Sequence, residues 1–371
     1  MKWLFAGGLA VHGLIHLMGF AKAFGYADLP QLTVPISRPM GLAWLLAAGL
    51  FLTTSVTLFF WPQRWWMPGA LALLTSQAAI ASSWADAKFG TLANVVVLSG
   101  VILGFASQGP VSFRAEFRKD VAEGLGRSVA EVVLSEADVA SLPAALRAYI
   151  SRTGALGQPR VSNFHVTFSG RIRSGPSATW MAFTGEQYNF HDEPSRFFIM
   201  DAAMYAIPFE AFHRFRNGAA TMRVKVASLF PVVDAKGPEM TRAETVTLFN
   251  DMCVFAPGSL VNSNIQWREI GARSVEGTFT NAGITIRAVL TFNDQGELVD
   301  FVSDDRLAGS KDGSSFTPMR WSTPLSGYRA FGAHTLSATG AGRWHPAGAE
   351  PYDYIQMSLT DIEYNVRSAG R

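Results

Sequence analysis

The chain has 371 residues, which is long enough for two domains that each bury a core. A formal net charge of only +2 gives no support to a nucleic-acid partner, because proteins that bind nucleic acid present a strongly basic face. The single cysteine, Cys253, excludes both an intrachain disulfide and a cysteine-rich metal site.

Residues 1–110 form a hydrophobic half in which charged side chains occur only at intervals. Asp, Glu, Lys and Arg are absent from four windows, residues 3–21, 39–63, 65–85 and 89–113. Spanning a bilayer takes ~20 mostly apolar residues, whereas a charge at its centre costs ~2.5–3.5 kcal/mol. We therefore expect a domain of about four transmembrane helices. A cleavable signal peptide would account for the first window alone.

The distribution of basic residues predicts which side of the membrane holds the rest of the chain. Four spans place both ends of the hydrophobic half on one side. That side carries more Lys and Arg residues near the spans than the other does: Lys2, Arg64, Arg114, Arg118 and Lys119 against Lys22, Arg38 and Lys88. The excess favours cytoplasmic termini and a cytoplasmic soluble domain.

Four polar residues within the windows are candidates for an intramembrane site: His12, His16, Gln77 and Asn94. The two histidines are four residues apart and project from one face of the first helix, which excludes them as opposite axial ligands of one haem. No carboxylate or cysteine lies in a window to complete a metal site, so we expect no metal and no cofactor. Two interpretations stay open: neutral histidines hydrogen-bonded inside the bundle, or a quinone-, lipid- or proton-handling site.

A helical neck, residues 111–157, is expected after the hydrophobic half. Ser141-Leu142-Pro143 is typical of a helix start, with proline in the first turn. Residues 144–150 continue the helix, and Gly154 and Gly157 end it.

Residues 158–371 are predicted to form a β-rich domain. Apolar and polar residues alternate in the runs 164–169 and 284–292, as they do in strands with one buried face. About ten strands fit between residues 161 and 366. Because strands and helices do not alternate, antiparallel hairpins are favoured over a parallel sheet. The apolar phase slips near the C-terminus, which predicts a β-bulge near Thr360-Asp361.

One helix interrupts these strands. Gly237-Pro238-Glu239 opens it, with proline and an acidic residue in the first turn, and it ends near Phe255, before Pro257. An apolar stripe that includes Val246 and Phe249 predicts that this helix packs into the concave face of a curved sheet. The expected fold is thus a membrane α-helical bundle followed by a β-rich α+β domain with a curved, half-barrel-like antiparallel sheet.

The β-rich half shows few signs of catalytic chemistry. It contains no Gly-rich phosphate loop, no G-x-S-x-G nucleophile elbow and no histidine pair at metal-ligand spacing, which argues against an enzyme. Glu186 is the one acid of interest, since a carboxyl group beside aromatic side chains can acquire a raised pKa. Large aromatic side chains are abundant, and on a concave sheet they can enclose a hydrophobic ligand. The candidate ligand-binding residues are Trp180, Phe183, Glu186, Tyr188, Trp267 and Trp321.

Six short segments stand out as motifs: His12–Phe20, Ile36–Gly41, Trp84–Thr91, Phe183–Tyr188, Pro231–Glu239 and Asp361–Asn365. Together they resemble an uncharacterised bacterial membrane-protein family that is known only as a domain of unknown function. The resemblance covers nearly the whole chain and transfers no catalytic residues. With the spans, it implies a multi-pass protein of the bacterial inner (plasma) membrane.

The β-rich half is also similar to the LolA/LolB type of lipoprotein carrier, in the order of its elements and in hairpins such as Phe292–Leu298. That resemblance implies a curved antiparallel sheet closed by helices over a hydrophobic cavity. Such carriers are periplasmic, whereas the charge count favours the cytoplasmic side. The side of the membrane that holds the domain therefore stays open.

These patterns favour a membrane-anchored protein whose β-domain binds a lipid or another hydrophobic small molecule, without catalytic activity of its own. The expected partners are membrane lipids and that ligand, and the sequence does not identify a protein partner. Two alternatives stay open. One is a membrane enzyme or a redox- or quinone-linked component that uses His12 and His16. The other is a scaffold or sensor that recruits a protein.

Overall fold

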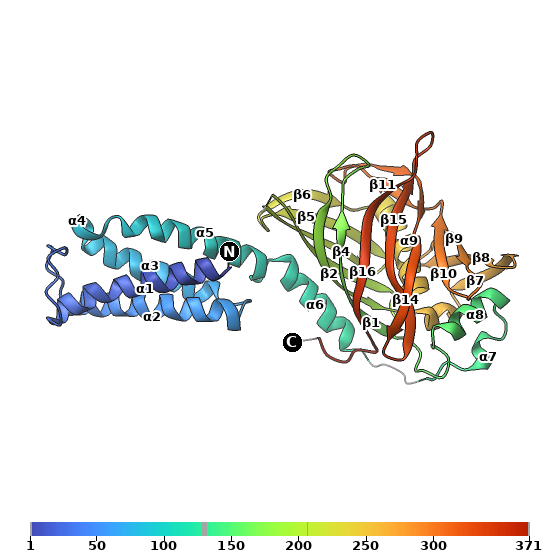
Figure 1. Cartoon of the computed structure of the whole chain (residues 1–371), viewed down its shortest axis with the longest axis horizontal. Coiled ribbons are helices and arrows are strands. Elements are labelled where there is room, and N and C mark those ends of the chain that lie inside the picture. Colours follow the sequence, from blue (N-terminus) through green and yellow to red (C-terminus); the bar gives the residue numbers. More distant parts are fainter. Residues whose placement is uncertain (1, 128–131, 206, 370–371) are drawn as a thin grey trace. The chain divides into compact units, whose positions relative to one another are not determined.

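The computed structural model describes residues 2–127, 132–205 and 207–369. It divides into two compact units, Met1–Glu116 and Phe117–Arg371 (Figure 1). The first unit is helical, and the second is built around a large sheet. Each unit is described by itself.

The first unit contains four long helices and a short one: α1 (Lys2–Phe24), α2 (Arg38–Phe60), α3 (Trp66–Ser82), α4 (Trp84–Ala87) and α5 (Gly90–Gln108). Consecutive long helices pack against one another. Glycines permit close approach between α1 and α2: a Cβ atom on Gly19 would lie 2.2 Å from the Trp44 ring. Small residues at such crossings are a common means of packing helices in membranes.

Three helical segments have the length and the apolar composition of a membrane span: α1, α2 and Gly90–Leu125, which comprises α5 and α6 (Phe113–Leu125). The remaining long helix, α3, has 17 residues, fewer than the ~20 that a span usually takes. Three helices of the expected bundle therefore have the length and composition of a membrane span. The number of spans is four only if α3 also crosses the membrane.

The second unit contains sixteen strands among the described residues. The first six are β1 (Asn163–Ile172), β2 (Met181–Phe190), β3 (Ser195–Met204), β4 (Ile207–Arg216), β5 (Ala219–Val226) and β6 (Phe230–Ala235). The next four are β7 (Ile265–Gly271), β8 (Ser274–Asn281), β9 (Ile284–Phe292) and β10 (Leu298–Ser303). The last six are β11 (Leu307–Gly309), β12 (Phe316–Pro318), β13 (Arg320–Ser322), β14 (Leu325–Phe331), β15 (His334–His345) and β16 (Tyr352–Tyr364).

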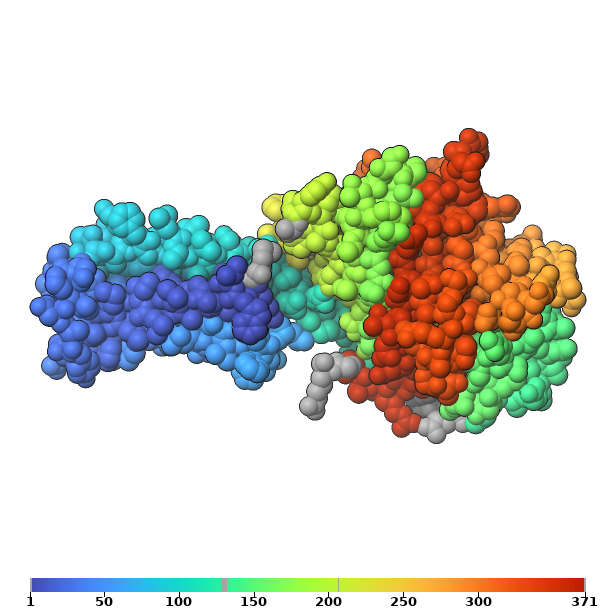
Figure 2. Space-filling view, viewed as in Figure 1, coloured from blue at the N-terminus to red at the C-terminus, as the bar shows by residue number. Residues whose placement is uncertain are grey.

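The main sheet has the strand order β6-β5-β4-β3-β2-β1-β16-β15-β13-β10-β9-β8-β7, with β14 paired to β15. The first six strands therefore run from the middle of the sheet to one edge. Helix α9 (Pro238–Phe255) and a short 3-10 helix (Pro257–Val261) then lead to β7 at the opposite edge. Figure 2 shows β14–β16 in red on the visible face, between the green first strands and the orange strands β7–β10.

Helix α9 lies inside the curve of this sheet, and most of its residues are buried (Figure 1). It begins at Pro238 and ends before Pro257, as its proline and Glu239 predict. The predicted β-bulge is also confirmed. Thr167 pairs with Asp361 and Phe168 with Leu359, which leaves Thr360 as the extra residue of β16.

The expected number of about ten strands is too low. Strand β3 shows why alternation is an incomplete guide, because Phe197, Phe198, Ile199 and Met200 are all buried. Both faces of the sheet are covered at this point, so no polar residue marks a solvent face. Very short strands such as β11–β13 carry too few residues to show a period at all.

The residues of α6 from Phe117 onward cover the outer face of β2–β4. The Phe117 ring lies 6.0 Å from Tyr188 and 6.1 Å from Phe212, measured between centroids. Asp120 accepts hydrogen bonds from Arg214 at 2.6 Å and Arg216 at 2.7 Å. These contacts fix the direction in which the chain enters the second unit.

Two further helices, α7 (Glu136–Val139) and α8 (Ala144–Arg152), belong to the same core as the sheet. Leu146 and Ile150 of α8 are fully buried. Tyr149 donates a hydrogen bond of 2.8 Å to the carbonyl of Cys253 on α9. The helices that follow residue 132 therefore help to hold α9 against the sheet.

Candidate functional site

A cavity of about 570 Å³ lies between α9 and the inner face of the sheet. One face of α9 lines it, through residues 240, 243, 244, 247, 250, 251 and 254, which recur at helical spacing. The opposite face of the helix packs on the β7–β10 part of the sheet, where Phe249 stacks on Phe279 at 5.2 Å. One face of α9 therefore lines the cavity, and a different, apolar face holds the helix against the sheet.

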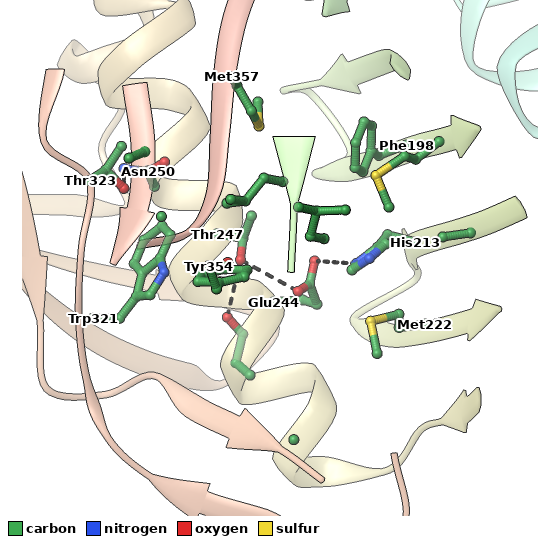
Figure 3. Close-up of a pocket in the computed structure, with 18 of the residues that line it drawn as sticks. Phe198, His213, Met222, Glu244, Thr247, Asn250, Trp321, Thr323, Tyr354 and Met357 are labelled. Atoms are coloured by element: carbon green, nitrogen blue, oxygen red, sulfur yellow. Dashed lines mark hydrogen bonds and ion pairs between the residues drawn. The ribbon is translucent and has the colours of Figure 1, made fainter. Parts of the chain in front are cut away.

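Most of the cavity wall is apolar. The strands contribute aromatic rings and flexible thioethers, among them Phe168, Phe198, Met200, Met222, Trp321 and Met357. Several of these side chains converge on one space in Figure 3. Methionine adapts to irregular shapes better than branched side chains do, so such a wall suits a ligand with a flexible apolar body.

A charged residue of α9, Glu244, interrupts this apolar wall. Its Oε1 accepts hydrogen bonds from Arg306 at 3.2 Å, and its Oε2 lies 3.3 Å from Nη1 of Arg196. The same Oε2 lies 3.7 Å from Nδ1 of His213 (Figure 3). Glu244, Arg196 and Arg306 are all buried. Glu244 thus joins two strands and a loop to the helix.

Arg196 also joins Glu244 to a second buried acid, Asp251. Its Nε donates to Asp251 Oδ2 at 2.7 Å, and the same oxygen accepts from Gln187 at 2.8 Å and Asn189 at 3.2 Å. Arg196 Nη2 in turn donates to Gln187 Oε1 at 2.9 Å. We call Arg196, His213, Glu244, Asp251 and Arg306 the buried charge cluster.

Burial and charge act in opposite directions on the two acids of the cluster. Burial opposes ionisation of Glu244, but the attraction of Arg306, the interaction with His213 and the charge of Arg196 together hold its pKa well below the usual range. Burial raises the pKa of Asp251 despite the opposing effect of Arg196 and the amide hydrogen bonds. Each guanidinium compensates the free-energy cost of burying a carboxylate. Loss of any one member would leave a buried charge without its partner and would destabilise the fold.

The cavity has room for a small molecule and offers it two kinds of contact. Its volume lies within the ~300–1,000 Å³ typical of ligand pockets. The apolar wall removes hydrocarbon from water, at ~0.8 kcal/mol for each methylene group buried. Thr247 and Asn250 lie on the same face of α9 as Glu244 and offer polar groups. The arrangement suits an amphipathic molecule.

Of the six candidate ligand residues, Trp321 lines the cavity. Phe183 is buried in the core of the sheet, beside Gly170. The Trp267 ring lies 5.8 Å from that of Phe249 in a tilted arrangement, and its indole N–H donates to the carbonyl of Leu260 at 3.0 Å.

The other three candidates lie outside the curve or at its end. Glu186 and Tyr188 both contact His165 on the outer face, Glu186 at 3.1 Å and Tyr188 by ring stacking at 4.3 Å. Trp180 lies against the guanidinium groups of Arg171 at 4.7 Å and Arg173 at 4.5 Å. Side chains alternate between the faces of a strand, so Phe183 and Tyr188, five residues apart on β2, point to opposite sides. The structure does not bring the six together.

The charge cluster was missed because its members come from four separate parts of the chain. One local signal exists on α9, where Glu244, Thr247 and Asn250 form a polar stripe within a helix bounded by apolar residues. Arg196 carries another, since it directly precedes the apolar run Phe197–Met200. A charged residue inside a buried strand requires a partner.

The four polar residues of the hydrophobic half do lie together. His12 Nε2 is 3.0 Å from Asn94 Oδ1, and Asn94 donates to Gln77 at 3.0 Å. His16 donates from Nδ1 to the carbonyl of His12 at 2.8 Å, and its Nε2 lies 2.8 Å from the hydroxyl of Ser76. The network connects α1, α3 and α5. Within residues 2–127, 132–205 and 207–369, no three His, Cys, Asp or Glu side chains gather to hold a metal ion.

The structure is thus that of an apolar helical unit joined to a β-domain with an internal cavity. A model of a family of unknown function, DUF6544, matches residues 132–356, more than half of the chain, and the chain belongs to that family. The expected membership of a family of unknown function is therefore confirmed. No curated protein matches the sequence.

Two solved structures illustrate what the β-domain is similar to. A LolA superfamily protein from Nitrosomonas europaea is 8% identical, with a TM-score of 0.34, and the match covers 60% of this chain and 92% of that one. A DUF1329 family protein from Desulfovibrio piger is 10% identical, with a TM-score of 0.33, and the match covers 64% of this chain and 96% of that one.

Replacing Glu244 tests the energetic weight of the charge cluster. Glu244→Gln keeps the shape of the side chain but leaves Arg306 and Arg196 without their shared carboxylate, so we expect a loss of about 3–5 kcal/mol in the free energy of unfolding. Glu276→Gln is the matched control, because Glu276 pairs with the exposed Arg268 and such pairs contribute about 0–1 kcal/mol. Denaturant titration followed by tryptophan fluorescence measures both. Equal losses in the two variants would contradict the assignment.

The lowered pKa of Glu244 predicts a pH dependence of stability. Ionised Glu244 stabilises the fold fully above the pKa of ~4.3 that a glutamate has in an unfolded chain. That contribution is lost as the pH falls from there toward the lower pKa of the folded state. The stability advantage of the wild type over Glu244→Gln should therefore be constant near neutrality and shrink as the pH is lowered below ~4.3. An advantage that grows on acidification would show that the sign is wrong.

Proposed function

We propose that this protein is anchored in the membrane and that its β-domain binds a lipid or another amphipathic molecule in the cavity beside α9. The observation that carries the proposal is the internal cavity of about 570 Å³, with its apolar wall and its single polar stripe. The acyl chain would lie along the methionine and aromatic side chains. Its polar end would face Thr247 and Asn250.

The charge cluster supports binding of a molecule with a polar end in a fixed orientation. Two arginines and two acids hold one another in place by hydrogen bonds, so the polar stripe is rigid before any ligand arrives. Preorganised groups cost less to order on binding than flexible ones do. The polar stripe would therefore select how an amphipathic molecule enters, while the apolar wall would supply most of the affinity.

We further propose that all four long helices of the first unit cross the bacterial inner membrane. Helix α3 packs between α2 and α5 and exposes Leu71 and Leu74 on its outward side, where lipid would cover them. Its 17 residues extend for ~26 Å at 1.5 Å per residue. A mismatch of a few ångströms with a ~30 Å hydrocarbon core costs little.

A redox or quinone-linked role for the histidine pair has less support. His16 uses both ring nitrogens within the bundle, and His12 is held by Asn94. These contacts support the interpretation that the pair stabilises the packing of α1 against α3 and α5. Lipid offers polar side chains no water to bond with, so they form hydrogen bonds with neighbouring helices instead.

Filling the cavity tests ligand binding. Ala211 lies on β4 at the cavity wall, and Ala211→Trp places an indole in the space that the ligand would occupy. We expect occupancy by co-purified lipid, measured by native mass spectrometry of the full-length protein, to fall at least about tenfold, which corresponds to ~1.4 kcal/mol. Ala349→Trp, at an exposed turn, is the control and should keep wild-type occupancy. A wild-type protein that never carries lipid would refute the proposal.

Cysteine accessibility tests the four spans. Cysteine is introduced at Gln63, Lys88 or Gly157, one position at a time, and labelled in intact and permeabilised cells with a reagent that does not cross membranes. The native Cys253 is buried in the β-domain and should not be labelled. If α3 spans, Gln63→Cys and Gly157→Cys lie on one side and Lys88→Cys on the other. If α3 does not span, Gln63→Cys and Lys88→Cys label together and Gly157→Cys differs. The same labels report which side holds the β-domain.

A further inference from the structure

Five large apolar side chains are exposed at two neighbouring turns of the sheet. Tyr205 and Ile207 lie where β3 is followed by β4, and Leu229, Phe230 and Val232 lie at the β5–β6 turn. Tyr205 is 84% exposed and Phe230 is 64% exposed. We call these five residues the apolar turn patch.

The two turns lie side by side at one end of the sheet. Phe209 pairs with Val226, which pairs in turn with Phe230. The turns are also joined by a hydrogen bond of 2.8 Å from the backbone N–H of Ala227 to the carbonyl of Pro208. The patch therefore lies at one end of the four strands β3–β6. Such a group of exposed apolar side chains is unusual, because contact between apolar surface and water is unfavourable.

The patch is continuous with the cavity. Val232 belongs to the patch and also lines the cavity. Phe209, two residues beyond Ile207 on β4, lines it as well. A molecule that passes between the cavity and this end of the sheet would therefore move along apolar side chains throughout.

The chain enters the β-domain from the direction of this same end. Phe117 of α6 lies against Phe212 in the middle of β4, whereas Asp120, further along α6, binds Arg214 and Arg216. Following α6 backward from Asp120 to Phe117 therefore leads along β4 from Arg216 toward Ile207. Within the second unit, α6 therefore runs back from Asp120 to Phe117 in the direction of the end of the sheet that carries the patch.

The connection to the last candidate span is short. Helix α5 ends at Gln108, and residues 109–117 can extend over at most ~30 Å. From Phe212 to Ile207, β4 covers five residues, or ~17 Å. The ~17 Å from Phe212 to the patch is shorter than the ~30 Å that the tether can extend, so the tether would allow the patch to reach the surface of a bilayer that holds α5.

We propose that the apolar turn patch docks on the surface of that lipid bilayer and that the ligand of the cavity is exchanged with the membrane across it. This inference deepens the proposed function and rests on it, because exchange requires a cavity that takes lipid. Exposed aromatic and aliphatic side chains at two neighbouring turns can insert into the boundary between headgroups and acyl chains. Docking would place the edge of the cavity directly against its source of lipid.

Depth-dependent quenching in the full-length protein tests the docking. An environment-sensitive fluorophore is attached at Leu229→Cys, and the protein is reconstituted in phosphatidylcholine–phosphatidylglycerol vesicles with or without lipids that carry a spin label on the acyl chain. We expect emission to fall about twofold or more, since interfacial side chains lie ~5–10 Å deep at the acyl boundary. Asp192→Cys, exposed at the β2–β3 turn on the opposite end of the sheet, is the control and should not be quenched.

The combined variant Phe230→Ser and Tyr205→Ser should abolish quenching at Leu229→Cys. Both side chains are exposed, so the fold, followed by thermal unfolding, should be retained. Unquenched emission at Leu229→Cys in the otherwise wild-type protein would overturn the proposal. A blue-shifted but unquenched label would also overturn it, and would show that protein, such as a second copy of the chain, covers the patch.

The docking and the proposed ligand binding can be refuted independently of each other. Quenching at Leu229→Cys does not depend on an occupied cavity, so a protein that co-purifies with lipid but shows no quenching refutes the docking alone. Conversely, quenching in a protein that carries no lipid supports contact of the patch with the bilayer and refutes the exchange.

Discussion

Burial of α9 on all sides imposes the constraint on which the rest of the β-domain depends. The helix connects the two edges of the sheet and lies inside its curve, so both of its faces must be satisfied by protein. One face is covered by packing of Phe249 against the rings of Phe279 and Phe301. The other face carries Glu244 and Asp251, whose charges are compensated by Arg196 and Arg306.

That division explains why a cavity exists at all. Apolar side chains interdigitate to high density when nothing prevents them from closing together. On the polar face of α9, the arginines hold the strands at the distance that their hydrogen bonds require. The sheet can therefore curve around the helix without collapsing onto this face. The same cluster that stabilises the helix also keeps the space open.

Features with a local cause were predictable from the sequence, and features that join distant segments were not. The ends of α9 and the bulge at Thr360 follow from proline positions and from a slip in alternation, both of which are visible in a few residues. The position of Glu186 and Tyr188 on the outer face depends on which side of β2 faces α9, and alternation alone does not reveal that. The charge cluster joins strands β3 and β4, helix α9 and the loop after β10, and only the folded chain shows that these segments meet.

The pairing of β16 with β1 has a consequence for the order in which the chain folds. These strands form the middle of the sheet, yet almost the whole β-domain lies between them in the sequence. Asn365 and Val366 add hydrogen bonds to Ser162 and Asn163. A sheet closed by its last strand has many contacts between distant residues, and such topologies form slowly. During synthesis the hydrophobic helices emerge first, while β1 waits for its neighbour until translation is nearly complete. The β-domain must therefore persist for some time as an unfinished sheet with an unpaired central edge.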